Sequence, residues 1–352
     1  MTLNCRRLVS LIRQAGIAVF ASVLVALAWP CGALAQEAPI RGAGEFTVPA
    51  WFKNSFLDLK EDAAEAGTHG KLLLVYIGQD GCPYCAALFN TNFSQKHIVD
   101  YTRDHFDAIE INLWGDRPVT DFDGEKLTEK TFAAKHDVWF TPTILFVDGR
   151  GRKILRVNGY YPPRRFIVAL RYVAEERAKD EAFGAYLTRV APDAAPGPLQ
   201  EEPFFDKLPY DLTTAVARRP IVVFFEQRDC DECAELHRNA FAQAETREQL
   251  ARFRAIQLDR WSATPVTTPD GRPLTARAWA DELGVGYVPT AVFFDQGREV
   301  MRIEAMLKAF HVQSVMDYVA SGAYRSQPSF QRFIQGRAER LRERGVAVDL
   351  WR

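Results

Sequence analysis

Short apolar runs divide the chain into two halves that share one pattern. Each half begins with a continuous apolar run, over residues 72–77 and 221–225. A later run starts directly after a proline in each half, over 143–147 and 290–294. Continuous apolar runs of this length are typical of strands buried inside a sheet. The pattern therefore predicts two buried strands in each half.

Each later run is followed by a turn and by a helical pattern. Gly-containing turns lie at 148–151 and 295–298, between apolar segments, as hairpin loops do. Apolar positions then recur at helical spacing over 166–173 and 312–319. Strands mixed with flanking helices place both halves in the α/β class.

The two halves are copies of one domain-sized repeat. Cys82 corresponds to Cys230 at an offset of 148 residues, and Pro142 corresponds to Pro289 at an offset of 147. A repeat of this length is a whole domain and not a solenoid unit. The sequence predicts a first domain over 46–190, a linker rich in proline and alanine over 191–199, a second domain over 200–322 and a helical extension over 323–352.

Composition supports this division and excludes one class of partner. The chain has 352 residues, of which 47% are hydrophobic, enough for two ordinary cores. Its formal net charge of −1 gives no electrostatic footprint for nucleic acid, so no nucleic-acid partner is expected.

The N-terminus has the features of an export signal. Arg6, Arg7 and Arg13 precede an uncharged apolar stretch over 15–29, and the small residues of 33–35 follow it. This stretch is shorter than the roughly 20 residues that span a bilayer. We expect a cleaved signal peptide over residues 1–35 and a periplasmic protein. The alternative is an uncleaved anchor in the inner membrane, facing the periplasm.

Removal of residues 1–35 leaves four cysteines, in two Cys-x-x-Cys pairs: Cys82 with Cys85, and Cys230 with Cys233. Each pair follows a predicted strand, where a helix would start. Two thiols in one helical turn can close a disulfide, and the helix N-terminus lowers the pKa of the first thiol. This arrangement predicts thiol–disulfide exchange.

Inert disulfides are one alternative. Zinc is another, but it would need four thiolates from two separate domains, so no metal or other cofactor is expected.

The order of strand, Cys-x-x-Cys, helix and X-Pro strand resembles the thioredoxin fold. The polar insertion over 114–128 resembles the equivalent stretch of SoxW-type periplasmic thioredoxins. The resemblance implies two tandem thioredoxin-like domains, each with a central mixed sheet flanked by helices, followed by the C-terminal helical tail. It also implies a cis proline beside each disulfide, so that the groove for a client is lined by Thr141, Pro142, Val288 and Pro289.

By this resemblance the chain is a protein-disulfide oxidoreductase, acting as a reductase, in which Cys82 attacks and Cys85 resolves. A sulfur-oxidation carrier protein and apocytochrome c are the implied clients, and a membrane thiol-electron transporter is the implied donor. Two alternatives stay open. One is a binding or chaperone module with a single active pair, and the other is a Cu(I) metallochaperone, because soft thiolates suit Cu(I).

Several residues distinguish this chain from the resembled family. The buried aspartate of thioredoxins is replaced by Tyr76 and Phe224. Around Cys230, the carboxylates of Asp229, Asp231 and Glu232 outnumber the one nearby arginine, Arg228. Negative charge disfavours a thiolate, so the second pair is predicted to be the stronger reductant. Two further predictions are a helix-face position for His237 and a solvated helix over 337–344.

Overall fold

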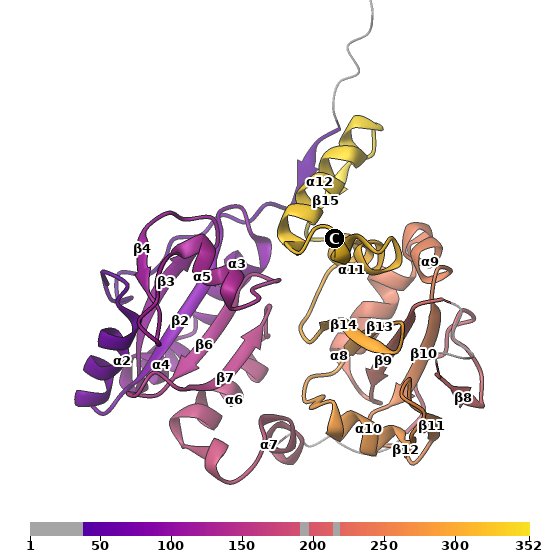
Figure 1. Cartoon of the computed structure of the whole chain (residues 1–352), viewed down its shortest axis with the longest axis horizontal. Coiled ribbons are helices and arrows are strands. Elements are labelled where there is room, and N and C mark those ends of the chain that lie inside the picture. The colour runs from indigo at the N-terminus through magenta and orange to yellow at the C-terminus, as the bar shows by residue number, and fades with distance from the viewer. Residues whose placement is uncertain (1–37, 191–196, 214–218) are drawn as a thin grey trace, which may run out of the picture.

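The structure is a computed structural model that describes residues 38–190, 197–213 and 219–352. The predicted signal peptide and most of the predicted linker lie outside these ranges. The described residues form two lobes, the first half of the chain in one and the second half in the other (Figure 1). Among the residues described, no helix has both the length and the apolar character needed to span a bilayer.

The first lobe is built on a four-stranded mixed sheet with the order β3-β2-β6-β7. The strand β2 pairs in parallel with β3 and antiparallel with β6. Its side chains alternate between two faces, so that Leu74 and Tyr76 join one core while Leu73 and Val75 join the other. The strands are β2 (Leu72–Gly78), β3 (Phe106–Asn112), β6 (Thr143–Val147) and β7 (Lys153–Asn158).

Helices cover both faces of this sheet, which explains why β2 is apolar along its whole length. The helical segments are α2 (Leu59–Thr68), α3 (Pro83–Ala87), the π-helix η1 (Leu88–Asn92), α4 (Lys96–His105), α5 (Glu129–Lys135), α6 (Pro163–Ala174), η2 (Arg177–Lys179) and α7 (Phe183–Val190). The predicted polar insertion contains a short hairpin of β4 (Pro118–Thr120) and β5 (Lys126–Thr128).

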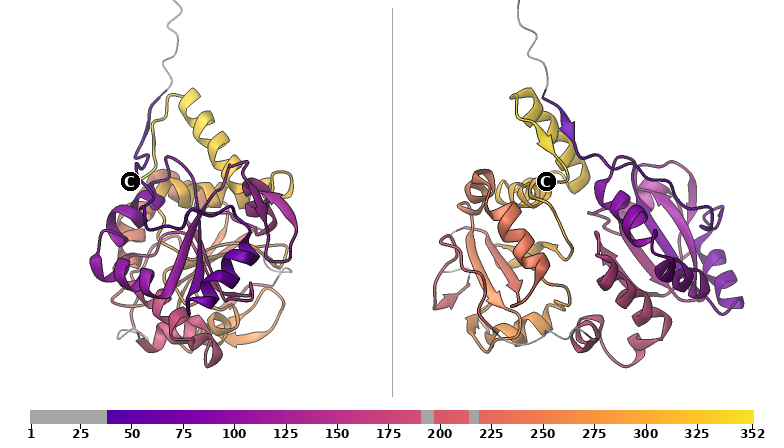
Figure 2. Two further views of the ribbon diagram at one scale, coloured as in Figure 1. Left: turned by 90° about the vertical axis from the view of Figure 1, so that its left-hand side faces the viewer. Right: turned by 180° about the vertical axis from the view of Figure 1, so that it is seen from behind.

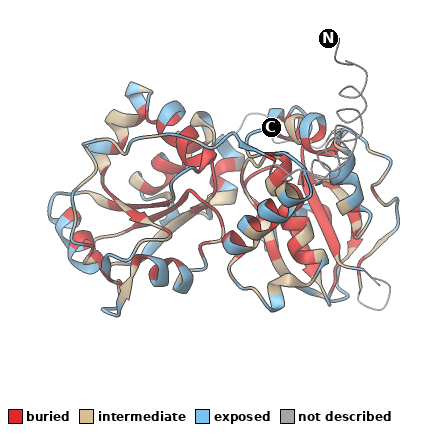
Figure 3. Ribbon diagram, turned by 90° about the horizontal axis from the view of Figure 1, so that it is seen from above, coloured by how far each residue is buried: buried red, intermediate tan, exposed pale blue. Residues whose placement is uncertain are grey.

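The second lobe repeats this topology, with the strand order β10-β9-β13-β14. Its strands are β9 (Ile221–Glu226), β10 (Arg254–Asp259), β13 (Thr290–Asp295) and β14 (Arg298–Ile303), with the smaller β8 (Tyr210–Asp211), β11 (Pro265–Thr267) and β12 (Pro273–Thr275) at one side. Its helical segments are α8 (Asp231–Glu235), the π-helix η3 (Leu236–Phe241), α9 (Ala244–Leu250), α10 (Ala276–Glu282) and α11 (Ala309–Ala320). The predicted α/β class, with a mixed sheet flanked by helices in each half, is confirmed. Buried residues concentrate in both lobes (Figure 3).

The C-terminal segment packs against both lobes. It contains η4 (Ala323–Arg325), α12 (Phe330–Glu343) and β15 (Val348–Asp349), which pairs in parallel with β1 (Ile40–Arg41). Figure 2 shows α12 in yellow beside the N-terminal strand, above the two lobes. The prediction of a solvated helix over 337–344 is wrong for one of its faces. Within this range Arg337 and Ala338 are buried, and Ala338 continues the buried positions of Phe330 and Ile334, because this face packs onto the protein.

Candidate functional site

The first cysteine pair lies where β2 leads into α3. Cys82 is the N-cap of α3, and its Sγ accepts a hydrogen bond from the Cys85 N–H at 3.0 Å. The two residues form a disulfide, with their Cα atoms 5.2 Å apart. Pro83 occupies the first helical position, where its missing N–H leaves no hydrogen bond unmade. Both sulfurs are shielded, since Cys82 is only 4% exposed and Cys85 is fully buried.

The structure brings the predicted groove residue Thr141 next to Cys82. The Thr141 hydroxyl lies 3.3 Å from the Cys82 Sγ, and the Thr141 carbonyl oxygen lies 3.5 Å from it. The Thr141–Pro142 peptide bond is cis. The segment before β6 therefore forms one wall of the site around Cys82.

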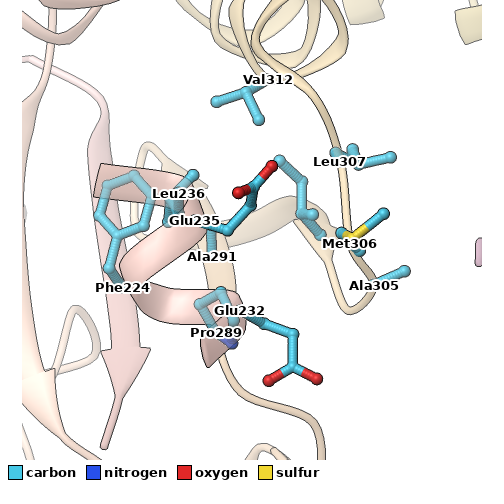
Figure 4. Close-up of a pocket in the computed structure, with 11 residues that line it drawn as sticks. Phe224, Glu232, Glu235, Leu236, Pro289, Ala291, Ala305, Met306, Leu307 and Val312 are labelled. Atoms are coloured by element: carbon cyan, nitrogen blue, oxygen red, sulfur yellow. The ribbon is translucent and has the colours of Figure 1, made fainter. Parts of the chain in front are cut away.

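The second pair repeats this geometry at the start of α8. Cys230 is the N-cap, accepts from the Cys233 N–H at 3.1 Å, and forms a disulfide with Cys233. Its Sγ lies 3.9 Å from the carbonyl oxygen of Val288, and the Val288–Pro289 bond is cis. Both cysteines are buried. A small hollow of about 20 Å³ lies on this side of α8, and Glu232, Pro289 and Leu307 are among its lining residues (Figure 4).

A charged cluster lies directly behind the second pair. His237 is buried on η3, one helical turn after Cys233. Its Nδ1 lies 2.9 Å from Glu202, and its Nε2 lies 3.1 Å from the buried Glu226 at the end of β9. Burial alone would lower the pKa of His237, but its hydrogen bonds to Glu226 and Glu202 outweigh burial and raise the pKa. The predicted helix-face position of His237 is confirmed, and the structure adds that this face is buried against Glu202 and Glu226.

The second lobe contacts the dipeptide of the first pair. The Tyr84 hydroxyl accepts a hydrogen bond from the Lys308 N–H at 2.8 Å and lies 3.1 Å from the His311 Nδ1. Desolvation, assisted by the nearby Arg337 guanidinium, lowers the pKa of His311 to about 3. The imidazole is therefore neutral and can accept a hydrogen bond from the Tyr84 hydroxyl. Trp351 packs edge-on against the Tyr84 ring, with the ring centroids 5.3 Å apart.

The first lobe in turn contacts the dipeptide of the second pair, and here the contact is a salt bridge. Arg164, at the start of α6, lies 3.1 Å from Glu232 and 3.6 Å from Asp231. Beside this contact, the rings of Tyr161 and Tyr287 stack with their centroids 4.8 Å apart. Arg164 offsets part of the negative charge that the sequence places around Cys230. The carboxylate excess behind the predicted redox difference is therefore smaller than the local sequence indicated.

Three of these interactions could not be predicted from the sequence, because the residues that form each of them are distant in the chain. Arg164 precedes Glu232 by 68 residues, and Tyr84 and Lys308 are 224 residues apart. The pairing of His237 with Glu202 and Glu226 also crosses separate segments. A single local signal was available, because His237 stands four residues after a cysteine on a predicted helix. Within the described ranges, no three histidine, cysteine, aspartate or glutamate side chains are grouped as metal ligands would be.

Comparison with known proteins identifies the family of both halves. A family model for a thioredoxin-like domain matches residues 59–174 and again residues 212–320. No curated protein matches the chain in sequence.

Several solved structures are similar to part of the chain. A thioredoxin-fold protein from Helicobacter pylori is 27% identical, covering 34% of this chain and 80% of its own, with a TM-score of 0.30. A thioredoxin from Thermus thermophilus is 26% identical, covering 33% and 84%, with a TM-score of 0.27. The oxidised C-terminal domain of Neisseria meningitidis DsbD is 13% identical, covering 33% and 92%, with a TM-score of 0.26.

Proposed function

This chain belongs to the thioredoxin-like family, and on that premise we propose that it is a thiol–disulfide oxidoreductase. One observation carries the proposal. Cys82 caps a helix with its sulfur, its partner Cys85 is buried one turn further on, and Thr141 lies against the sulfur. The helix N-terminus stabilises a thiolate at Cys82, and burial of Cys85 keeps the second thiol beside the first.

In the reductive direction the reduced Cys82 thiolate attacks one sulfur of a client disulfide. The client S–S bond breaks, one client sulfur leaves as a thiolate, and a mixed disulfide with Cys82 forms. The Cys85 thiolate then attacks the Cys82 sulfur and releases the second client thiolate. Two electrons have moved to the client, and the Cys82–Cys85 disulfide remains. A dithiol donor must return these electrons before the next turnover.

The polar insertion over 114–128 resembles that of SoxW-type periplasmic thioredoxins, and the N-terminus has the features of an export signal. We place the protein among SoxW-type reductases, exported to the periplasm by a signal peptide over residues 1–35 that is then cleaved. Its proposed clients are protein disulfides, with a sulfur-oxidation carrier protein and apocytochrome c as candidates, and a membrane thiol-electron transporter is the proposed donor. Cell fractionation tests export, and recovery of the protein only from the cytoplasm would contradict it. Sequencing the N-terminus of the exported protein tests cleavage, and the presence of residues 1–35 would contradict it.

The activity itself is tested with the full chain and two disulfides, cystine and insulin. We expect the protein to accelerate the dithiothreitol-driven reduction of at least one of them, and Cys82→Ser to return the rate to the uncatalysed background. Cys85→Ser should instead accumulate the mixed disulfide, because the attacking thiol is kept and the resolving thiol is lost. Full turnover by Cys82→Ser would show that the first pair is not the site of exchange.

The same preparations separate the two alternatives. A binding module with one active pair predicts that Cys230→Ser leaves every redox measurement unchanged. A Cu(I) carrier predicts one bound copper in protein purified under reductant, with the copper lost in Cys82→Ser. The absence of copper together with catalysed reduction would favour the oxidoreductase.

A further inference from the structure

A cavity of about 240 Å³ opens beside Cys82, and we call it the Cys82 cavity. Cys82, Tyr84 and Thr141 line it from the first lobe. Phe310 of α11 and Ile334 of α12 line it from the opposite side. The approach to the first disulfide is thus bounded by α11 of the second matched domain and by α12, which lies outside both matched thioredoxin-like domains.

The helix α12 is held on this site by specific contacts. Gln331 accepts a hydrogen bond from the Gln79 side chain at 3.0 Å and donates one to the Trp139 carbonyl oxygen at 2.7 Å. Phe330 packs edge-on against Phe140, with the ring centroids 5.4 Å apart. Trp139 and Phe140 lead directly into Thr141, and Gln79 donates a hydrogen bond to the Thr141 hydroxyl, so α12 covers the edge along which a client would approach Cys82.

The volume of the cavity limits what can reach the sulfur. Cavities that hold drug-sized molecules are about 300–1,000 Å³, whereas one water occupies about 30 Å³ of the liquid. The Cys82 cavity lies between these sizes, and Cys82 itself is only 4% exposed. A compact molecule can therefore enter, but a folded protein cannot bring a disulfide to Cys82 while α12 is docked.

The lining suits a molecule with an apolar middle and polar ends. Phe140, Phe310 and Ile334 supply apolar surface, while Gln335 and Arg342 add polar groups from α12. A short aliphatic disulfide that carries charged or amide groups has this distribution.

We propose that the Cys82 cavity admits low-molecular-weight disulfides with polar ends, such as cystine, and that α12 withholds Cys82 from folded proteins. The proposal rests on the proposed oxidoreductase function, and while α12 is docked it assigns small disulfides as the clients in place of the protein disulfides named there. The Cys82 thiolate attacks one sulfur of the small disulfide, releases one small thiolate and forms a mixed disulfide. Cys85 then displaces the second small thiolate and closes the Cys82–Cys85 disulfide, with electrons resupplied by a dithiol donor.

The test isolates the first pair in the full chain that carries Cys230→Ser and Cys233→Ser. The reduced protein is mixed with cystine or with insulin, and oxidation of Cys82 and Cys85 is followed by a maleimide gel shift. Each rate is divided by the rate at which the same disulfide oxidises dithiothreitol, which removes differences in intrinsic reactivity. We expect the normalised cystine rate to exceed the insulin rate by about 100-fold, because only cystine can place its sulfur correctly.

Two substitutions in α12 then change the cavity or its cover. Ile334→Trp fills the cavity, and Gln331→Ala removes the two hydrogen bonds that Gln331 makes with Gln79 and Trp139. We expect each to lower the ratio of normalised cystine to insulin rates by about tenfold, the first by obstructing cystine and the second by admitting insulin. Glu343→Gln, at an exposed position of the same helix, is the matched control and should leave the ratio unchanged.

The outcomes separate this inference from the function beneath it. Equal normalised rates for cystine and insulin, or a ratio that neither substitution changes, would overturn the role of the cavity and leave the oxidoreductase proposal intact. Oxidation of neither disulfide faster than the dithiothreitol reference would count against the oxidoreductase itself.

Discussion

The two cysteine pairs begin helices of the same design, but different side chains lie beneath them. The positions compared at an offset of 148 are Tyr76, Gly78 and Phe89 in the first domain and Phe224, Glu226 and His237 in the second. In the first domain Phe89 packs edge-on against Tyr76, with centroids 5.0 Å apart, and a side chain at Gly78 would collide with the Tyr76 hydroxyl. In the second domain a carboxylate and an imidazole fill the equivalent space.

This difference teaches that in one fold the helix that carries the disulfide can pack on either aromatic or ionic side chains. The aromatic side chains cannot exchange protons near neutral pH, since burial raises the pKa of Tyr76 far above its ordinary value. The ionic side chains can, because His237 lies between Glu202 and Glu226, one helical turn after Cys233. The surroundings of the two buried second cysteines therefore differ in their capacity to take up a proton.

The dipeptides between the cysteines differ in the same sense. Tyr84 and Glu232 are equivalent positions, and each is contacted by the opposite lobe. Tyr84 meets Lys308 and His311 through hydrogen bonds between neutral groups, whereas Glu232 meets the guanidinium of Arg164. Ionic contacts are screened by salt and neutral hydrogen bonds are not, so the contacts of Tyr84 and of Glu232 with the opposite lobe should respond differently to ionic strength.

Replacing the imidazole of the second domain with the phenyl ring of the first should have the largest effect. His237→Phe gives the second domain the residue that the first domain has at the equivalent position, Phe89. Glu226, which is 1% exposed, would then lose its cationic partner inside the protein. Breaking a buried charge pair costs about 3–5 kcal/mol. We expect the free energy of unfolding of the second domain to fall by that amount, measured by hydrogen exchange of the β9 amides.

Glu226→Gln in the same chain is the control for this prediction. The neutral amide removes the uncompensated charge, so the double variant should regain much of the lost stability. An additive or larger loss in the double variant would show that His237 stabilises the domain by packing and not by charge.

Removing the neutral contact at the other dipeptide should have a smaller effect. Tyr84→Phe keeps the ring packed against His311 and Trp351 but leaves the Lys308 N–H and the His311 Nδ1 without their partner. Such unsatisfied groups cost about 1–3 kcal/mol. We expect hydrogen exchange at the Lys308 amide to accelerate correspondingly. The change should be the same at about 0.05 and 1 M salt, and a strong salt dependence would contradict a neutral contact.

His237 should also make the stability of the second domain depend on pH. A raised pKa means that His237 binds its proton more tightly in the folded protein than in the unfolded chain. Its stabilising contribution is therefore complete below pH about 6.5 and is lost as pH rises through the raised folded value. Each unit of pKa difference corresponds to about 1.4 kcal/mol. Denaturant titrations between about pH 6 and 9 should show the second domain losing stability relative to His237→Phe.

The elements that hold the cysteines could be predicted from the sequence because their signals are local. The apolar runs of β2 and β9 and the cysteine spacing at α3 and α8 each lie within a few adjacent residues. The resemblance to the thioredoxin fold then placed Thr141 and Val288 beside the two pairs. The sequence could not predict the contacts between the two lobes, because they join side chains that are distant in the chain.

The C-terminal helix is an intermediate case. Phe330, Ile334 and Ala338 recur every fourth residue, which is a readable apolar stripe, but the dense charge of 337–344 drew the prediction toward a solvated helix. Even a correct assignment of the stripe would not have identified what it covers. The helix reaches Trp139 and Gln79, which lie about 190 and 250 residues earlier in the chain.

The smallest effect concerns the charge balance at the second pair. Arg164 is more than half exposed, and pairs of this kind are worth about 0.2–1 kcal/mol. Arg164→Gln removes a positive charge beside Glu232 and Asp231 and so makes a thiolate at Cys230 less favourable. The disulfide is then favoured, and the reduction potential of the second pair should fall by about 5–20 mV. Titration of the full chain carrying Cys82→Ser and Cys85→Ser against glutathione measures this potential. A rise on loss of Arg164, or a fall that persists unchanged in about 1 M salt, would show that this arginine does not act on the thiolate through its charge.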